Sequence, residues 1–394
     1  MMDTDSTHVE APAHAAAAVA TSAALPALDR CVSIAPAPEQ TAEQTVPPHL
    51  HHHQQVGKSS AMAPLARHAT FASWPAANAA AAAVNARASQ STLISAAQAR
   101  LSNAVKPTRP IPAGVPNLDE EDYDLSLMYV PEYAAEIYEY LNNLQHVYAI
   151  NPTYLSRQPE ITARMRSILV GWLFQVHQTW PFKQETLYLA VHVLDRFLQR
   201  RQVPRTRLQL IGLTSFIIAA KYEEIYIPEI TEFVALTHNL FSSQDVLVAE
   251  SEILVALGFN LGTPSPLHFL RRGYRASPCR PKTYTFAKYM CELSLYSAEM
   301  LEFPQSTIAG AALFVSRRIT SPTEVAWDDS MQFYLFTPYE AMLRCARTLL
   351  ELLRVAHTDN VYEAVYNRFR DEANQRVSRI PLNAEKLELV FKDI

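Results

Sequence analysis

The stretch Ser215–Ile230, SFIIAAKYEEIYIPEI, decides how this chain folds. Residues 216–220 are apolar on every side, and a helix that is hydrophobic all round has to be surrounded by other parts of the protein. Lysine then occupies position 221, although a charge is unfavourable in a protein interior unless it is paired. The sequence therefore predicts a buried central helix over 208–221 with a charged residue at its C-terminal end.

The segments around this helix also have helical patterns. Residues 131–144, PEYAAEIYEYLNNL, place Tyr133, Ile137 and Leu141 at helical spacing. Alternation typical of strands is nearly absent, Asn-Gly and Asp-Gly hairpin pairs do not occur, and the breaks between helical stretches are short. We therefore predict an all-α fold, with one five-helix unit around the central helix and a second unit of similar size after Pro264.

Residues 1–116 differ from the rest of the chain in composition. Ala, Pro, Ser, Thr and Gln dominate, and large aliphatic and aromatic residues are sparse, so this part has little apolar surface to bury. It is predicted to be a disordered low-complexity region. Its histidine-rich run, PPHLHHHQQ, suggests metal binding, but no packed scaffold is expected there to fix the ligands, and disorder is the favoured interpretation.

Composition argues against several classes of function. A net charge of −5 over 394 residues gives no general attraction to nucleic acids or anionic membranes, and no stretch is long enough to span a bilayer. The cysteines Cys31, Cys279, Cys291 and Cys345 lack metal-binding spacing, so neither a metal site nor a disulfide framework is expected. Only eight glycines occur, and none forms a GxGxxG, Walker A or GxSxG motif. We expect no cofactor and no nucleotide-dependent catalysis.

Several charged residues lie on otherwise apolar helical faces. Arg166 is expected to form a buried structural pair with an acid such as Asp195, which also lies among apolar neighbours. Lys221 and Glu250 allow two interpretations. They either pair with each other, or they reach the border of the core and face a second protein, because long side chains can bury their stems and expose their heads.

The helix predicted over residues 163–176 has two apolar faces. One consists of Met165, Leu169 and Trp172, and the other of Ile168, Leu173 and Val176. Such residues ordinarily belong to a core. Because one helix cannot easily bury all of them, a shallow exposed apolar groove is the alternative.

Four stretches resemble the cyclin box of the eukaryotic cell-cycle cyclins. In chain order they are MRSILVGWLFQVH (165–177), ETLYLAVHVLDRFL (185–198), LQLIGLTSFIIAAKYEEIYIPEI (208–230) and FNLGTPSPLHFLRR (259–272). The similarity extends from Leu118 to Val390. AINPTYLSRQPEI (149–161), PLHFLRR (266–272) and Gln175 are similar to the B-type, mitotic branch in particular.

The resemblance implies two tandem five-helix cyclin folds preceded by a short N-terminal helix. The domains would be the disordered residues 1–116, the N-terminal helix and cyclin box over 117–262, and the C-terminal cyclin fold over 263–394. It also implies a non-catalytic subunit that binds and activates a cyclin-dependent kinase of the mitotic type. Such a protein drives the G2/M transition and helps to recruit substrates, in the nucleus and cytoplasm.

The resemblance further implies which residues act. In this family the lysine of the (A/S)K(F/Y)EE motif and a glutamate of the fifth helix contact the mobile C helix of the kinase; here these are Lys221 and Glu250. The kinase-binding surface would extend over Tyr222, Glu223, Glu224 and Ile225. A substrate-docking patch for RxL-type motifs would comprise Met165, Ile168, Leu169, Trp172, Arg205 and Gln209. A phosphate pocket would use Arg271 and Lys288, with Tyr284 where a histidine is frequent.

Two features depart from the pattern of the family. Gly171 replaces the aspartate usual in MRxILVDWL, and a glycine inside a helix costs about 1 kcal/mol relative to alanine. Residues 1–116 contain neither an RxxL nor a KEN sequence. The sequence therefore contains no N-terminal destruction signal of the usual kind.

Two other classes of protein fit less well. A cyclin-fold transcription factor would carry a zinc ribbon ahead of the folds and a basic face for nucleic acid. The zinc ribbon is missing, and the part of the chain predicted to fold is net acidic. An enzyme would need a nucleophile, a base or a metal site in one constellation. His177 and His192 are single histidines in predicted helices, which is more typical of packing than of catalysis.

Overall fold

The computed structural model describes residues 109–119, 131–382 and 390. All of them belong to one of the two compact units into which the chain divides. Every regular element in these residues is helical, which confirms the all-α prediction. The prediction of disorder for residues 1–108 lies outside the described residues. None of the described helices is long and apolar enough to cross a bilayer.

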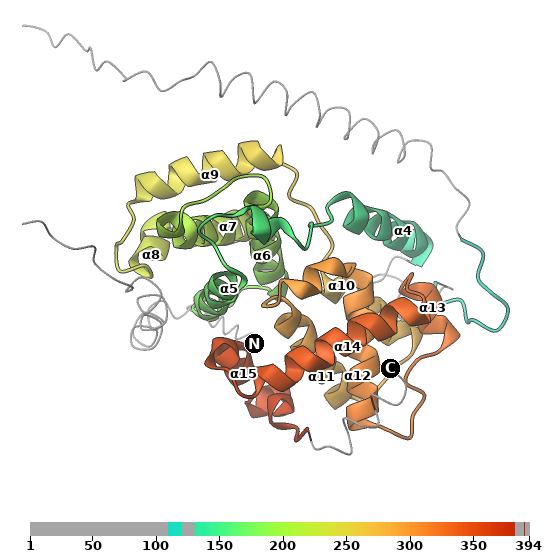
Figure 1. Cartoon of the computed structure of the whole chain (residues 1–394). Coiled ribbons are helices and arrows are strands. Elements are labelled where there is room, and N and C mark those ends of the chain that lie inside the picture. The colour runs from blue at the N-terminus through green and yellow to red at the C-terminus, as the bar shows by residue number, and fades with distance from the viewer. Residues whose placement is uncertain (1–108, 120–130, 383–389, 391–394) are drawn as a thin grey trace, which may run out of the picture. The chain divides into compact units, whose positions relative to one another are not determined.

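The first five-helix unit is built around α7 (Leu208–Glu223), the helix that the sequence predicts to be central. Around it lie α5 (Ala163–Gln178), α6 (Gln184–Leu198), α8 (Ile230–Ala235) and α9 (Ser243–Leu257) (Figure 1). All residues from Leu210 to Ala220 are buried. Burial of each large apolar side chain contributes about 1.5–3 kcal/mol, so α7 supplies much of the core of this unit.

Both ends of α9 have residues suited to those positions. The Ser242 hydroxyl accepts a hydrogen bond from the Asp245 backbone N–H at 3.2 Å, and the Asp245 carboxylate accepts one from the Ser242 N–H at 2.8 Å. This reciprocal pair satisfies two N–H groups that have no partner within the helix. Gly258 follows the last turn with a φ of 60°, which glycine adopts without steric cost. The two caps fix the length of α9 and the position of Glu250 within it.

The second five-helix unit is centred on α12 (Gln305–Thr320), which is buried along most of its length. Its other members are α10 (Pro266–Ala276), α11 (Pro281–Ser294), α13 (Asp329–Tyr334) and α14 (Tyr339–Ala356). α15 (Glu363–Arg368) follows and lies against α5 of the first unit (Figure 1). The predicted architecture of two tandem five-helix units is confirmed.

Short 3₁₀ helices connect these elements. They are η1 (Tyr154–Arg157), η2 (Arg205–Arg207), η3 (Glu299–Glu302), η4 (Asn360–Tyr362), η5 (Glu372–Asn374) and η6 (Val377–Arg379). Buried apolar residues of both five-helix units belong to one continuous cluster. The two units therefore share a core at their junction.

A helix and a short segment precede the two units. α4 (Pro131–Val147) is the expected N-terminal helix. Residues 109–119 contain no helix, yet the Tyr334 hydroxyl of α13 donates a hydrogen bond to the Pro116 carbonyl oxygen at 2.7 Å, and Val115 is buried. The predicted end of the disordered region at residue 116 therefore falls within a segment that packs on the second unit.

Two arginine contacts hold the same segment. The Arg109 guanidinium carbon lies 4.3 Å from the centre of the Phe333 ring, a cation–π arrangement. Near the other end, Arg272 of α10 donates two hydrogen bonds of 2.6 Å to the Asp119 carboxylate. Planar guanidinium groups match carboxylates in this paired geometry, so the segment is fixed at both of its ends.

Gly171 lies where the two five-helix units touch. A Cβ at this position would be 3.1 Å from the Val361 carbonyl oxygen, in η4, and 3.3 Å from Cε1 of Tyr296, which follows α11 in the second unit. The absent side chain therefore makes room for the close approach of the two units.

We expect Gly171→Asp, which restores the residue usual in the family, to destabilise this chain by about 1–3 kcal/mol, because the new side chain has to displace a backbone carbonyl and a ring. Thermal unfolding followed by circular dichroism should show a lower Tm. Ser251→Asp on the exposed side of α9 is the control and should leave the Tm nearly unchanged. A Tm of Gly171→Asp equal to that of the wild type would show that the junction can open to accept a side chain.

Candidate functional site

The Lys221 ammonium and the Glu250 carboxylate form an ion pair at the border of the first unit. Lys221 lies in the last turn of α7 and Glu250 in the middle of α9, and Nζ donates to Oε1 at 2.6 Å. The Lys221 side chain is 42% exposed and the Glu250 side chain 13%. In this chain the two groups therefore pair with each other, with solvent on one side. A surface pair contributes at most about 1 kcal/mol, so exchanging it for contacts with a partner costs little stability.

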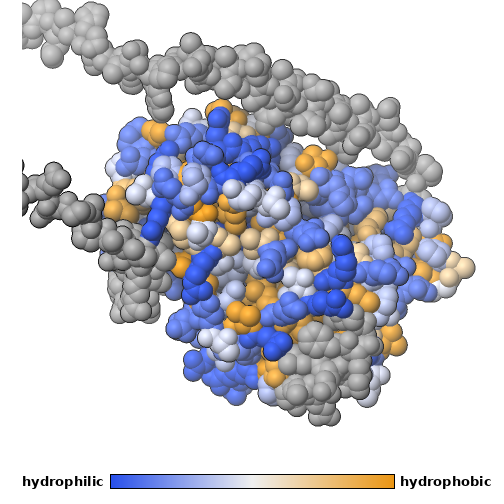
Figure 2. Space-filling model, viewed as in Figure 1, coloured by the Kyte–Doolittle hydropathy of each residue, from blue (hydrophilic) through white to orange (hydrophobic). Residues whose placement is uncertain are grey.

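Large apolar side chains are exposed in the loops next to this pair. Ile225 and Tyr226, after α7, are 84% and 89% exposed, and Phe259, directly after α9, is 67% exposed. Tyr222 is exposed in the last turn of α7 itself. Figure 2 shows further apolar residues among hydrophilic ones on the face of the molecule seen in Figure 1. Several exposed apolar side chains around one charged pair are typical of a protein–protein interface.

Of the two glutamates that follow Tyr222, Glu224 is engaged within the protein. Its Oε1 accepts hydrogen bonds from the Lys183 backbone N–H at 2.8 Å and from the Thr186 hydroxyl, at the N-terminus of α6. Lys183 in turn donates from Nζ to the Glu223 carbonyl oxygen at 2.9 Å. Burial raises the pKa of the Glu223 carboxyl. These contacts fix the loop after α7, so Glu224 maintains the shape of the surface and offers little contact area of its own.

Arg166 and Asp195 form a fully buried ion pair. Nε and Nη2 of Arg166 donate to the two carboxylate oxygens at 2.6 and 2.5 Å, and the Tyr154 hydroxyl donates to Oδ1 at 2.7 Å. Nη1 of Arg166 donates to the carbonyl oxygens of Leu295 and Tyr296, in the second unit, at 2.9 and 3.1 Å. Burial and the Asp195 carboxylate raise the pKa of the Tyr154 hydroxyl. All three nitrogens of the Arg166 guanidinium donate to acceptors inside the protein, so this network joins the two units.

The substrate-docking patch expected from the sequence is only partly accessible. Met165, Ile168, Arg205 and Gln209 are partly exposed, whereas Leu169 and Trp172 are buried. Leu169 is enclosed because α7 carries Gly212 opposite it, where a Cβ would lie only 2.8 Å from Leu169 Cδ1. Leu169 and Trp172 also pack in the core of the first unit, and their part in substrate docking stays a prediction. The other four residues form a shallow surface, called here the docking surface.

The cations of the expected phosphate pocket lie at the junction of the two units. Arg271 of α10 forms an ion pair with Glu185 of α6. Lys288 of α11 is partly buried, and burial lowers the pKa of its ammonium. The Tyr284 ring packs against Tyr274, with ring centres 4.8 Å apart. Arg271 therefore bridges the two units, and its side chain stays 52% exposed. Its part in a phosphate pocket stays a prediction.

Glu292 on α11 is a fully buried carboxyl that sequence reasoning missed. Gln184 Nε2 of α6 donates to its Oε1 at 2.8 Å, and Arg368 Nη1 of α15 lies 3.5 Å from its Oε2. Burial raises the pKa of Glu292 to about 7, although Arg368 and Lys288 act in the opposite direction. A charged residue within an apolar run, the signal that identified Arg166, was also present in the stretch YMCELSLY around Glu292.

Comparison with known proteins identifies the family. The model of the cyclin N-terminal domain matches residues 136–262, and that of the cyclin C-terminal domain matches residues 264–383. The G2/mitotic-specific cyclin-B2 of Anguilla japonica is 38% identical over 281 residues, which cover 71% of this chain and 70% of that protein. The chain belongs to the cyclin family.

The resemblance to B-type cyclins is confirmed by further relatives. The G2/mitotic-specific cyclin-B2 of Homo sapiens is 35% identical over 70% of this cyclin and 68% of the human protein. The G2/mitotic-specific cyclin-B of Spisula solidissima is 37% identical over 68% of this cyclin and 61% of that protein. The chain thus spans a little less than two thirds of the Spisula relative.

A solved structure has the same fold. A viral cyclin from herpesvirus saimiri matches this cyclin with a TM-score of 0.50 at 19% sequence identity. The match covers 55% of this chain and 96% of the viral one. At this level of identity the likeness supports the fold alone.

Of the two helical histidines of this cyclin, His177 is buried and His192 is partly buried. Burial lowers the pKa of His177 to about 4 and that of His192 to about 3. Nε2 of His177 lies 2.8 Å from the Lys183 carbonyl oxygen, a contact that fixes the turn into α6. Within the described ranges, no group of three His, Cys, Asp or Glu residues is arranged to hold a metal ion.

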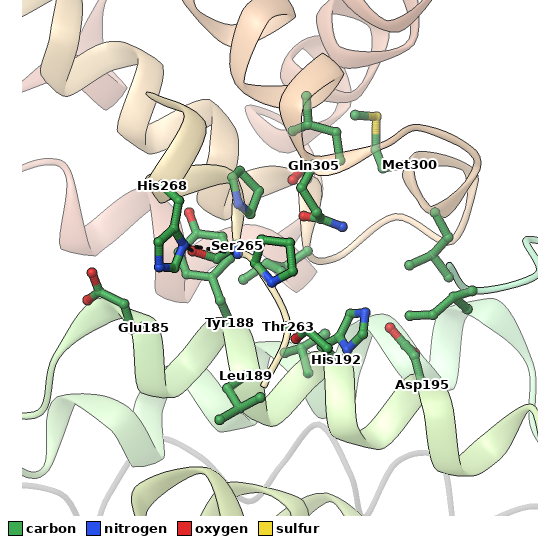
Figure 3. A pocket seen from close by; sticks show the side chains of 18 of the residues that line it. Glu185, Tyr188, Leu189, His192, Asp195, Thr263, Ser265, His268, Met300 and Gln305 are labelled. Carbon is green, nitrogen blue, oxygen red and sulfur yellow. Dashed lines mark hydrogen bonds between the residues drawn. The ribbon is translucent and has the colours of Figure 1, made fainter. Parts of the chain in front are cut away.

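A small cavity lies between α6 and the linker into α10 (Figure 3). Tyr188 and His192 line it from α6, Thr263 and Ser265 from the linker, and its volume is about 50 Å³. The Tyr188 hydroxyl and Nδ1 of His192 have no hydrogen-bond partner among the described residues. Since one water needs roughly 10–15 Å³, the cavity accommodates a few waters and is too small for a nucleotide.

Proposed function

We propose that this cyclin is the non-catalytic regulatory subunit of a cyclin-dependent kinase of the mitotic type and activates it for the G2/M transition. The observation that carries the proposal is the Lys221–Glu250 pair, which lies at the border of the first unit near exposed apolar side chains, with the lysine partly exposed. The G2/mitotic-specific names of the relatives support the mitotic assignment. Action in both nucleus and cytoplasm is part of the same proposal.

Activation would occur by a shift between two states of the kinase. A kinase of this class is inactive alone because its C helix is rotated outward, and the Lys–Glu pair that orients the ATP phosphates is not formed. A partner that binds the inward state more tightly increases the population of that state. Burial of Ile225, Tyr226 and Phe259 against the kinase would supply affinity. Lys221 and Glu250 would exchange their mutual hydrogen bond for bonds to the C helix and so fix its angle.

Replacing Lys221 and Glu250 together by alanine should lower kinase binding and activation by at least about tenfold, because charged hydrogen bonds within a desolvated interface are costly to lose. Purified kinase is captured by the immobilised cyclin, and phosphorylation of histone by the complex is measured.

The chain offers a matched control, a second ion pair between the start of α7 and α9. Arg207, directly before α7, pairs with Glu252 of α9 at 2.9 Å, and Arg207→Ala with Glu252→Ala should leave binding intact. The proposed contact is wrong if the Lys221/Glu250 variant, with an unchanged Tm, binds and activates the kinase as the wild type does.

Substrate recruitment is the second part of the proposed function. Met165 and Ile168 offer a shallow apolar surface on α5, and Gln209 of α7 and Arg205 offer polar groups at its side. A short motif with a single apolar anchor, as in RxL-type sequences, suits a surface of this depth.

A further inference from the structure

Four arginines lie in two neighbouring loops, one of which leads into the docking surface at Arg205. Arg157 ends η1, Arg200 and Arg201 follow α6, and Arg205 begins η2. The first three side chains are exposed and that of Arg205 is partly exposed. Among the residues that the structure describes, none of the four forms an ion pair with a carboxylate.

Hydrogen bonds between the two loops bring these arginines together. Gln158 is buried between the loops, and its Nε2 donates to the carbonyl oxygens of Leu198 and Arg201 at 2.6 and 2.7 Å. Gln202 Nε2 donates in the other direction, to the Arg157 carbonyl oxygen at 3.0 Å. The loop that contains η1 and the loop after α6 therefore form one continuous surface.

The charge of this surface is opposite to that of the whole chain. Glu160 contributes one carboxylate, which accepts a hydrogen bond from the Arg205 backbone N–H at 3.0 Å. Arg207, the next arginine along the chain, is already paired with Glu252. Four arginines thus stand against one carboxylate here, whereas the complete chain carries a net charge of −5. A short anionic segment is attracted to this place, while a long polyanion is repelled by the rest of the molecule.

We infer that the docking surface of this cyclin selects substrates whose docking motif is flanked by aspartates or glutamates. The inference rests on the proposed function and deepens it. Arg205 belongs both to the docking surface and to the four arginines. Glu160, which accepts a hydrogen bond from the Arg205 backbone N–H, stands five residues before Met165 in the chain. When the apolar anchor of a peptide packs on Met165 and Ile168, one of the segments that flank this anchor therefore lies along the loops that carry the arginines. Carboxylates in that flank form ion pairs that a neutral flank lacks.

The test measures binding of three fluorescein-labelled peptides with the same Arg-x-Leu core and with flanks of four glutamates, four serines or four lysines. Anisotropy titrations use the full chain, free and in complex with its kinase. In about 50 mM salt the glutamate peptide should bind about tenfold more tightly than the serine peptide, because several exposed ion pairs add at low ionic strength. The lysine peptide should bind most weakly. In about 0.5 M salt the three should bind alike, because exposed charges are then screened.

Reversing the charge of selected arginines tests whether this surface, and not another part of the protein, causes the preference. Arg200→Glu with Arg201→Glu should abolish the preference for glutamate flanks and create one for lysine flanks. Arg354→Glu with Arg370→Glu reverses two exposed arginines of the second unit and its C-terminal extension, and it should keep the wild-type preference. Both variants should activate the kinase normally towards a short substrate without a docking motif, which distinguishes this inference from the kinase proposal.

Three results would overturn the inference. The first is equal affinity of the wild type for all three peptides, and the second is no peptide binding while kinase activation persists. The third is tighter binding of a short DNA duplex than of the glutamate peptide, lost in the Arg200/Arg201 variant, since the surface would then recognise nucleic acid. The titrations on the free chain decide the question even for a preparation that binds no kinase.

Discussion

Replacing Asp195 by alanine should lower the free energy of unfolding of this cyclin by about 3–5 kcal/mol, because it leaves a buried arginine without its counter-charge. Nε and Nη2 of Arg166 and the hydroxyl of Tyr154 would all lose their acceptor. The Arg166 and Asp195 side chains are 0% and 1% exposed, so bulk solvent does not reach the charge that is left unpaired. Folded proteins are stable by about 5–15 kcal/mol in total, so the variant should lose a large part of its stability.

Urea denaturation followed by tryptophan fluorescence measures this loss. Asp195→Asn keeps the shape and one acceptor oxygen and should lose less than Asp195→Ala. Glu351→Ala, at an exposed position on α14, is the surface control and should change the free energy of unfolding by less than about 0.5 kcal/mol. A loss below about 1 kcal/mol for Asp195→Ala would contradict a stabilising role of the pair at the junction of the two units.

Raising the pH from about 5 to about 8 should remove stability on the order of 3 kcal/mol through Glu292 alone. Burial raises the pKa of this carboxyl from 4.5 to about 7 in the folded chain. Below the unfolded pKa the carboxyl is protonated in both states, and its burial is then least unfavourable. Between the two pKa values only the unfolded chain releases the proton, so stability falls as the pH rises. Above the folded pKa the loss is complete.

The groups that face Glu292 favour its charged form and are outweighed by burial. Arg368 of α15 and Lys288 of α11 attract the carboxylate, and Gln184 of α6 donates a hydrogen bond to it. His177 and His192 have the opposite effect on the pH dependence of stability. Burial lowers the pKa of each imidazole, so the unfolded chain takes up these protons first and stability falls as the pH falls.

A comparison with Glu292→Gln isolates the carboxyl from the histidines. The stability of the wild type relative to this variant, from urea denaturation at several pH values, should decrease between about pH 5 and pH 8. Glu299→Gln removes an exposed carboxyl of η3 and should show no such slope. If the difference in unfolding free energy between wild type and Glu292→Gln stays constant with pH, the carboxyl is charged throughout this range. Its protonation then has no effect on stability, and the prediction is wrong.

The core of the first unit could be predicted because it depends on residues close together in the sequence. The helix expected over 208–221 is α7, Leu208–Glu223, and its all-round apolar character alone requires a central position. A charge within an apolar run has to be neutralised nearby, which made Arg166 and Asp195 recognisable as partners. Both arguments use only local pattern and the cost of burying a charge.

The features that escaped prediction depend on contacts between distant parts of the chain. Segment 109–119 has few large apolar residues, and its position depends on Tyr334, which is 218 positions from its partner Pro116. On α5 the two apolar faces look equivalent in sequence, and Gly212 of α7 determines that Leu169 is enclosed. Glu292 had a visible local signal, but its partners come from α6 and α15 and cannot be found by spacing.

Segment 109–119 also determines how mechanical tension would enter the protein. A machine that grips the chain ahead of residue 109 and pulls would load the contact of Arg109 with Phe333 first. Two further contacts would follow, the Pro116–Tyr334 bond and the Asp119–Arg272 pair. Both contacts end in the half of the protein that the ribosome makes last. Unravelling from the N-terminal side would therefore strain α10 and α13 before it reached the Lys221–Glu250 surface.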